Sequence, residues 1–165
     1  MKKLAAVIFS TAFVVMGLAG PAAAQTAGNQ RFIVFGSGSG DQESFNVVAV
    51  GPITGFGTFE ELEDPDFVRF RFPQGTITLF SPTADETGSF DERSCTGSFT
   101  FTGPITITEA TGAFTGAQGT GTVQGQGYFV GERTADGCSE DEDTGFFFLY
   151  ADVTANVTLA GQAAA

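Results

Sequence analysis

Apolar and polar side chains alternate with a period of two along most of the chain, which is the pattern of β-strands. In residues 96–109 hydroxyl groups occupy most even positions, and the odd positions include the apolar residues Phe99, Phe101, Ile105 and Ile107. In residues 144–159 the odd positions form an unbroken apolar row from Phe147 to Leu159. No long segment repeats every 3.6 residues as a helix would. The sequence predicts eight strands: Arg31–Gly36, Ser44–Val50, Gly55–Leu62, Phe67–Phe72, Thr76–Phe80, Thr96–Glu109, Gln118–Gly131 and Thr144–Leu159.

The strand predicted at 118–131 has glycine at most of its odd positions, among them Gly125 and Gly127. Glycine weakens an ordinary strand, but a glycine face lets a sheet coil tightly and leaves room for bulky neighbours. A closed barrel needs both, and closure removes the sheet edges. We therefore predict an all-β fold, a single eight-stranded antiparallel β-barrel. A ligand cavity above the glycines is the functional alternative.

Two other barrels are alternatives to this fold. A lipocalin-like up-and-down barrel has the same strand number. An outer-membrane barrel needs outward apolar bands on every strand, whereas residues 96–109 place threonine opposite the apolar row.

The stretch Ile107–Gly119, with the sequence ITEATGAFTGAQG, resembles the strand–turn–strand segment shared by allene oxide cyclases and dirigent proteins. The family pattern is Ile-Thr-Gly-Gly-Thr-Gly-x-Phe/Tyr-x-Gly-Ala-x-Gly. Glu109 and Ala110 replace its glycine pair, while the other positions match: Thr111, Gly112, Phe114, Gly116, Ala117 and Gly119. The resemblance implies an eight-stranded barrel and a secreted bacterial member. It covers a structural segment and carries over no catalytic residue.

The N-terminus has the layout of a signal peptide. Lys2 and Lys3 precede the apolar run Leu4–Leu18, and Ala22–Ala24 gives a small-residue cleavage site. We predict a signal at 1–24, one barrel domain at 25–165, and a secreted or periplasmic location. No second apolar run is long enough to span a bilayer, so no membrane insertion is predicted.

The predicted mature chain is strongly acidic. Residues 25–165 hold five arginines against 19 acids, a net charge of −14, with no lysine and no histidine. Nucleic acids and anionic lipids need a basic footprint, so both are excluded as partners. The acids cluster at residues 60–66 and at Asp136 with Glu140–Asp143. Neither cluster has the spacing of an EF-hand, and both are interpreted as solvated hairpin tips, with cation binding as the alternative and no metal site predicted.

Missing residue types exclude much of catalytic chemistry. Without histidine there is no Ser-His-Asp triad and no histidine-based zinc or haem site, and two cysteines cannot form a Cys₄ site. No cofactor is predicted. Cys95 and Cys138 are the only cysteines of an exported chain, so we expect a disulfide. The two cysteines are 43 residues apart, and closing a loop of this length would contribute about 4 kcal/mol to stability by the entropic model. A reactive thiol is the alternative.

The candidate site residues fall in two groups. Glu109 could be an inward acid or base, or a turn residue facing water, while Tyr150 and Asp152 share the outer row of the last strand. Arg69 and Arg71 share an outward face, either paired with carboxylates or grouped at a barrel mouth. The residues predicted to bind a ligand in the lumen are Gly125, Gly127, Phe129, Phe147 and Leu149.

These observations favour a barrel that binds a small apolar ligand in its lumen. The resemblance implies an alternative, a cofactor-free cyclase or isomerase. A structural or surface protein with a filled barrel is the third hypothesis. We also expect a dimer or trimer, because Phe146, Phe148 and Tyr150 form a large outward aromatic patch.

Overall fold

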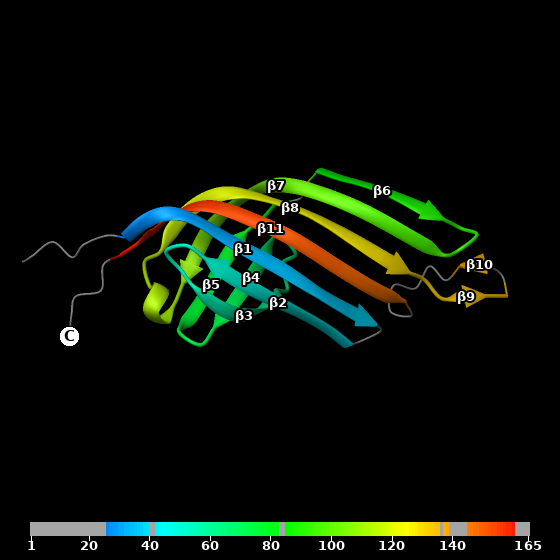
Figure 1. The fold of residues 1–165 in the computed structure, drawn as a ribbon, viewed down its shortest axis with the longest axis horizontal. Coiled ribbons are helices and arrows are strands. Elements are labelled where there is room, and N and C mark those ends of the chain that lie inside the picture. The colour runs from blue at the N-terminus through cyan, green and yellow to red at the C-terminus, as the bar shows by residue number, and fades with distance from the viewer. Residues whose placement is uncertain (1–25, 40–41, 83–84, 136, 139–144, 161–165) are drawn as a thin grey trace, which may run out of the picture.

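The computed structural model describes residues 26–39, 42–82, 85–135, 137–138 and 145–160, and it is built almost entirely of antiparallel strands (Figure 1). The predicted signal at 1–24 lies outside these residues, as do Asp136 and Glu140–Asp143. The elements are β1 (Thr26–Ser39), β2 (Gln42–Val50), β3 (Gly55–Glu61), β4 (Phe67–Phe72), β5 (Gly75–Phe80), β6 (Asp85–Asp91), β7 (Thr96–Ala110), the 3₁₀ turn η1 (Gly112–Phe114), β8 (Gln118–Val130), β9 (Arg133–Thr134), β10 (Gly137–Cys138) and β11 (Phe146–Leu159).

Eight of these strands form a closed antiparallel barrel. Around the ring the order is β1, β2, β3, β4, β5, β7, β8 and β11, and β11 pairs with β1 to complete it. Each of the eight predicted strands corresponds to one strand of this ring, within a few residues at the ends. The predicted fold class is therefore confirmed.

Two local predictions were incomplete. No pattern in the sequence predicted β6, because its seven residues, DETGSFD, are all exposed and carry only one apolar side chain. β6 continues the direction of β5 along β7: β5 pairs with residues 106–110 of β7, and β6 pairs with residues 96–102. The strand predicted at Arg31–Gly36 ends three residues too early. Residues 37–39, a serine–glycine segment, extend β1, because they pair with both β2 and β11.

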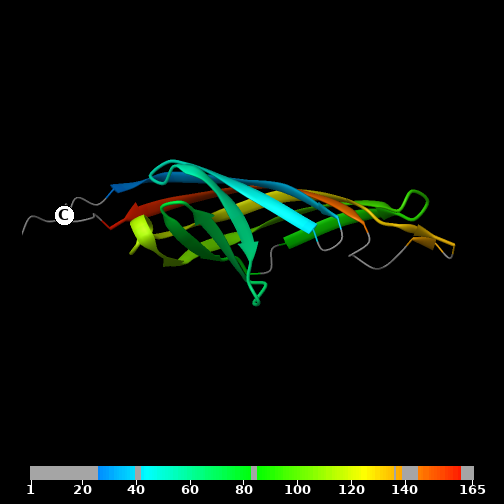
Figure 2. The same cartoon turned by 90° about the horizontal axis from the view of Figure 1, so that it is seen from below.

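The barrel is closed along only one half of its length. The strands β3, β4 and β5 are short and lie at one end, while β1, β7, β8 and β11 run on well beyond them (Figure 1). Seen from below, the long strands continue as a curved sheet from the end that the short strands enclose (Figure 2). In that open half, among the described residues, β6 pairs only with β7 and residues 42–45 of β2 pair only with β1.

The segment that resembles allene oxide cyclases closes the barrel. It ends β7 and turns through η1, where the backbone of Thr111 donates to the Thr76 carbonyl at 2.9 Å. Ala113 likewise donates to the Gln74 carbonyl at 2.9 Å. Gly112 has a φ of +61°, and a Cβ there would collide with the Gln74 carbonyl. The glycine therefore permits both the turn and the backbone contact that joins β7 to β5.

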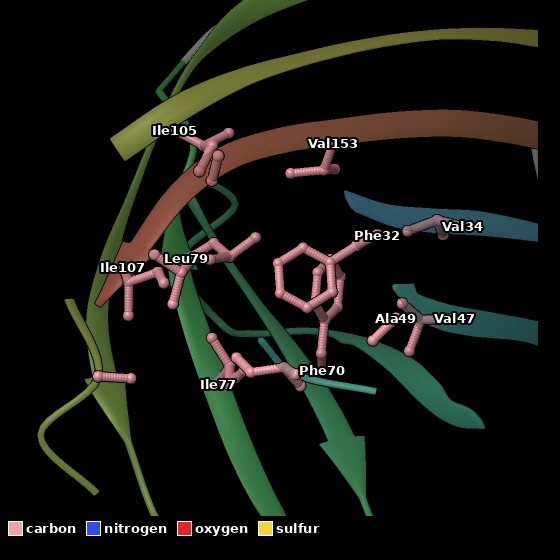
Figure 3. Close-up of a cluster of buried hydrophobic side chains, with 14 of the residues drawn as sticks. Phe32, Val34, Val47, Ala49, Phe70, Ile77, Leu79, Ile105, Ile107 and Val153 are labelled. Carbon is pink, nitrogen blue, oxygen red and sulfur yellow. The ribbon is translucent and has the colours of Figure 1, made fainter. Parts of the chain in front are cut away.

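Apolar side chains fill the closed half. Phe32, Phe70 and Ile77 are almost completely buried, and they meet residues from several strands at the centre of the barrel (Figure 3). Two polar residues are also buried, Thr78 and Gln30. The Gln30 amide accepts from the Ile53 backbone at 2.8 Å and donates to the Ile53 carbonyl at 3.0 Å, which holds Ile53 in the barrel end. Because both ends of the amide are paired, Gln30 has a structural role.

Candidate functional site

The open half of the barrel contains a cavity of about 1060 Å³. Its walls come from strands on every side, and phenylalanine is the commonest residue in them. The phenylalanines are Phe45, Phe59, Phe70, Phe90, Phe99, Phe101, Phe129, Phe146 and Phe147. The volume lies at the upper end of the range of small-molecule sites, and apolar walls of this kind are typical of them. A second depression, around Glu109 and Gln118, is more open to solvent.

Six of these rings form a continuous aromatic wall. Starting at Phe101, successive ring centroids are 6.2 Å apart to Phe99, 5.9 Å to Phe147 and 6.1 Å to Phe45. The series continues at 5.7 Å to Phe59 and 6.2 Å to Phe70. These separations are those of favourable stacked and edge-to-face pairs. The wall therefore connects the open half to the buried core at Phe70.

The glycine row of β8 makes room for this wall. A Cβ at Gly125 would collide with the ring of Phe101, and one at Gly127 would collide with the ring of Phe99. Gly97 on β7 is covered in the same way by Phe129. Of the residues predicted to bind a ligand, Phe129, Phe147 and Leu149 line the cavity. Gly125 and Gly127 instead lie beneath the rings that line it.

The disulfide predicted between Cys95 and Cys138 is present. It joins the turn between β6 and β7 to the short hairpin of β9 and β10, at the far end of the open half. Cys95 is buried, and its carbonyl accepts from Gly131 at 2.7 Å. Gly131, Gly137 and Cys138 all line the cavity. The cross-link therefore holds one end of the cavity in place.

Four glutamates also belong to the lining, and it contains no arginine or lysine in the part of the chain that the structure describes. Glu43 and Glu61 come from β2 and β3 on one side of the opening. Glu86 comes from β6, and Glu92 from the turn that follows it, on the other side. We call these four residues the lip glutamates. They give the apolar cavity an acidic rim.

The outer face carries the arginines. Arg31 binds both carboxylate oxygens of Asp152 through its Nε, each at 2.9 Å. Arg71 Nε donates to Glu60 at 2.6 Å, and Arg69 lies 4.0 Å from Glu60. The outward interpretation of the Arg69 and Arg71 pair is thus confirmed. Tyr150 and Asp152 also lie on the outer row of β11, away from the cavity.

Glu109 faces outward, and a β-bulge is the reason. Thr78 pairs with Glu109 and Leu79 pairs with Ile107, so Thr108 is an extra residue in β7. The extra residue reverses the alternation after Ile107. Glu109 is therefore mostly exposed, in β7 and not in the turn, with its carboxylate 4.0 Å from Arg69. The geometry does not fit the inward acid or base considered from the sequence.

The pKa values of two adjacent glutamates of β3, Glu60 and Glu61, are shifted in opposite directions. The hydrogen bond from Arg71 lowers the pKa of Glu60 on the outer face. Burial against the cavity wall and the neighbouring Glu43 carboxylate raise the pKa of Glu61 on the lip. The Glu61 side chain is exposed overall, so solvent screens both effects. Glu60 thus has arginine partners, whereas Glu61 makes no ion pair with any described residue.

The lip glutamates are not among the site residues predicted from the sequence, although the sequence contains a signal for them. Glu43 shares the parity of Phe45 and Val47 in β2, and Glu61 shares the parity of Phe59 in β3. A charged residue that continues an inward apolar row marks the point where the row leaves the core. The same test identifies Glu86, which shares its parity with Phe90.

Among the described residues, no cluster of three or more acidic, cysteine or histidine side chains could hold a metal ion. The part of the chain that is described also contains no helix long and apolar enough to cross a membrane. No family model, curated protein or solved structure matches this chain. The resemblance to allene oxide cyclases and dirigent proteins, like the predicted dimer or trimer, therefore stays a prediction.

Proposed function

We propose that this protein is a secreted or periplasmic barrel that binds a small apolar ligand in the open half of its lumen. The observation that supports this function is the cavity of about 1060 Å³ with its phenylalanine wall. The closed half is already filled by its own side chains, so the ligand would occupy the open half alone. Export is supported by the N-terminal sequence and by the disulfide, which forms in oxidising compartments.

A neutral hydrophobic dye such as Nile red tests this proposal. We expect its fluorescence to rise on binding to the wild type. Leu149→Trp should fill part of the cavity and weaken dye binding roughly tenfold, a loss of about 1.4 kcal/mol. Gln126→Trp is the matched control, because Gln126 is exposed and neighbours Tyr150 on the outer face. It should leave dye binding unchanged.

Thermal unfolding of both variants shows whether each is folded. No rise in fluorescence with the wild type would contradict the proposal and favour the structural hypothesis, a barrel with no ligand. Equal weakening by both tryptophans would contradict the assignment of the site to the cavity.

A cofactor-free cyclase or isomerase is the second candidate, and one observation favours it. Glu61 is a carboxyl group at the rim of an apolar cavity, and burial raises its pKa in the direction that favours a general acid. Glu109, Tyr150 and Asp152 lie on the outer face, so any such chemistry would use the lip glutamates instead. Mass spectrometry and chromatography of an unsaturated ligand after incubation separate the two functions. Binding alone returns the ligand unchanged, whereas an isomerase returns a product of the same mass and a different retention time.

A further inference from the structure

Charged side chains are arranged differently on the outer face of the barrel and in the lining of its cavity. On the outer face, Arg31, Arg69 and Arg71 pair with carboxylates. Among the described residues, the cavity lining contains four glutamates and no cationic side chain. Arg133 lies beside the lining, and its guanidinium donates to the backbone carbonyls of Glu92 and Arg93. The cavity is therefore negative at its rim and apolar within.

The lip glutamates have no partner of their own. Within the described ranges, none of the carboxylates of Glu43, Glu61, Glu86 and Glu92 makes an ion pair or accepts a side-chain hydrogen bond. By contrast, Glu60, Glu109 and Asp152 on the outer face all lie within 4.0 Å of an arginine. Glu43 also acts on Glu61 as a like charge. A cation at the rim would relieve this repulsion.

The aromatic wall reaches the same rim. Phe45 lies two residues from Glu43 on the inward row of β2, and Phe59 lies two residues from Glu61 on that of β3. The two rings are in contact, with centroids 5.7 Å apart. Aromatic faces attract cations, and quaternary ammonium groups are bound in proteins by such rings. Carboxylates and aromatic faces therefore meet at one place, and both favour positive charge.

We propose that the cavity selects an amphipathic cation, with the apolar body among the phenylalanine rings and an ammonium head between Glu43 and Glu61. This inference rests on the proposed binding function and specifies its ligand class. An anionic amphiphile such as a fatty acid has the same apolar body but the opposite charge, so the rim repels it.

Three probes with the same ten-carbon chain test the proposal: decyltrimethylammonium, decanol and decanoate. Each is titrated below its micelle concentration against the protein loaded with Nile red, and displacement of the dye is measured. We expect the ammonium compound to bind roughly tenfold more tightly than decanol, and decanoate to bind most weakly.

The double variant Glu43→Gln and Glu61→Gln should lose most of the preference for the cation and keep the affinity for decanol. Glu86→Gln alone should lose part of it, and it keeps the test decisive if the double variant does not fold. The matched control is Glu63→Gln with Asp85→Asn. It removes two charges from exposed residues outside the cavity lining, and it should keep the full preference.

The outcomes separate the two proposals. If decanol displaces the dye and the ammonium compound binds no more tightly, the inference of a cation is overturned and the binding function stands. If Nile red itself does not bind to the wild type, both are overturned, and if the dye binds but the ammonium compound does not displace it, the inference of a cation alone is overturned. If the lip variants retain the preference, or the control variant loses it as fully as they do, the head does not lie between Glu43 and Glu61.

Discussion

Phenylalanine has a different role in the closed half of the barrel than in the open half. In the closed half Phe32 and Phe70 are 0% and 1% exposed, because strands surround them on all sides. In the open half Phe99, Phe101 and Phe147 are only half-buried, and Phe90 is 49% exposed. All these rings continue inward rows of their strands. The comparison shows that the lengths of β3, β4 and β5, and not the inward pattern, decide whether a phenylalanine becomes core or cavity wall.

The largest expected difference between the halves is in stability. Phe32→Ala removes a fully buried ring and should lower the free energy of unfolding by about 3–5 kcal/mol. Phe99→Ala removes a half-buried ring and should lower it by about 1–2 kcal/mol, in proportion to the smaller apolar area that is buried. Urea denaturation of both variants measures the difference. Equal losses would mean that the open half is packed as tightly as the closed half.

A smaller loss of stability is expected from a substitution in the glycine row of β8, which the aromatic wall covers. Gly125→Leu should lower the free energy of unfolding by roughly 1–3 kcal/mol, because its side chain must displace the Phe101 ring that covers Gly125. It should also weaken dye binding, since the displaced ring moves into the cavity. Gln126→Leu, one residue along and on the exposed face, is the control and should change stability by less than about 0.5 kcal/mol. A Gly125→Leu variant as stable as wild type would show that the space above the glycine is empty.

The smallest expected change in stability comes from replacing Glu61, which lies at the cavity rim, or Glu60, which lies on the outer face of β3. The pKa of Glu61 is raised in the folded state, so its ionisation disfavours folding at pH 7. Glu61→Gln should therefore stabilise the protein at pH 7, by less than about 1 kcal/mol because the side chain is exposed. The gain should disappear as the pH falls through the folded pKa toward the ordinary value of a glutamate.

Glu60→Gln should have the opposite sign. The pKa of Glu60 is lowered, so its stabilising contribution is present above the ordinary glutamate pKa and is lost as the pH falls through the folded value. Thermal unfolding of both variants between pH 3 and pH 7 measures the two trends. The same sign for both variants would show that the faces of β3 do not differ in charge environment.

Most of the fold could be read from local periodicity. Apolar alternation located the eight strands of the ring and identified the inward rows, including Ala151, Val153, Ala155 and Val157 on β11. Periodicity could not locate β6, since a strand that lies at an edge with both faces exposed needs no apolar row. It also ended the first strand at Gly36, because only pairing with β2 and β11 makes the serine–glycine segment of residues 37–39 a strand.

The candidate site was harder to predict from the sequence than the fold. The alternation assigned Phe129, Phe147 and Leu149 to the inner face, where they line the cavity. It also left Glu109 open as an inward group, because a bulge at Thr108 changes the parity without any mark in the sequence. A bulge arises where two strands fail to keep register, so it depends on the partner strand as much as on the bulged one.

The sequence by itself determined most of the inward rows and which cysteines pair, and it excluded chemistry that needs histidine, since each of these follows from residue type and spacing along one chain. Only the tertiary structure decided that the barrel closes over half its length, that the rings of Phe99 and Phe101 cover Gly127 and Gly125, and that the lip glutamates line one opening, where the described lining contains no arginine. These features depend on strands that are distant in sequence. Their relative lengths and registers are set by pairing and packing, which local patterns do not encode.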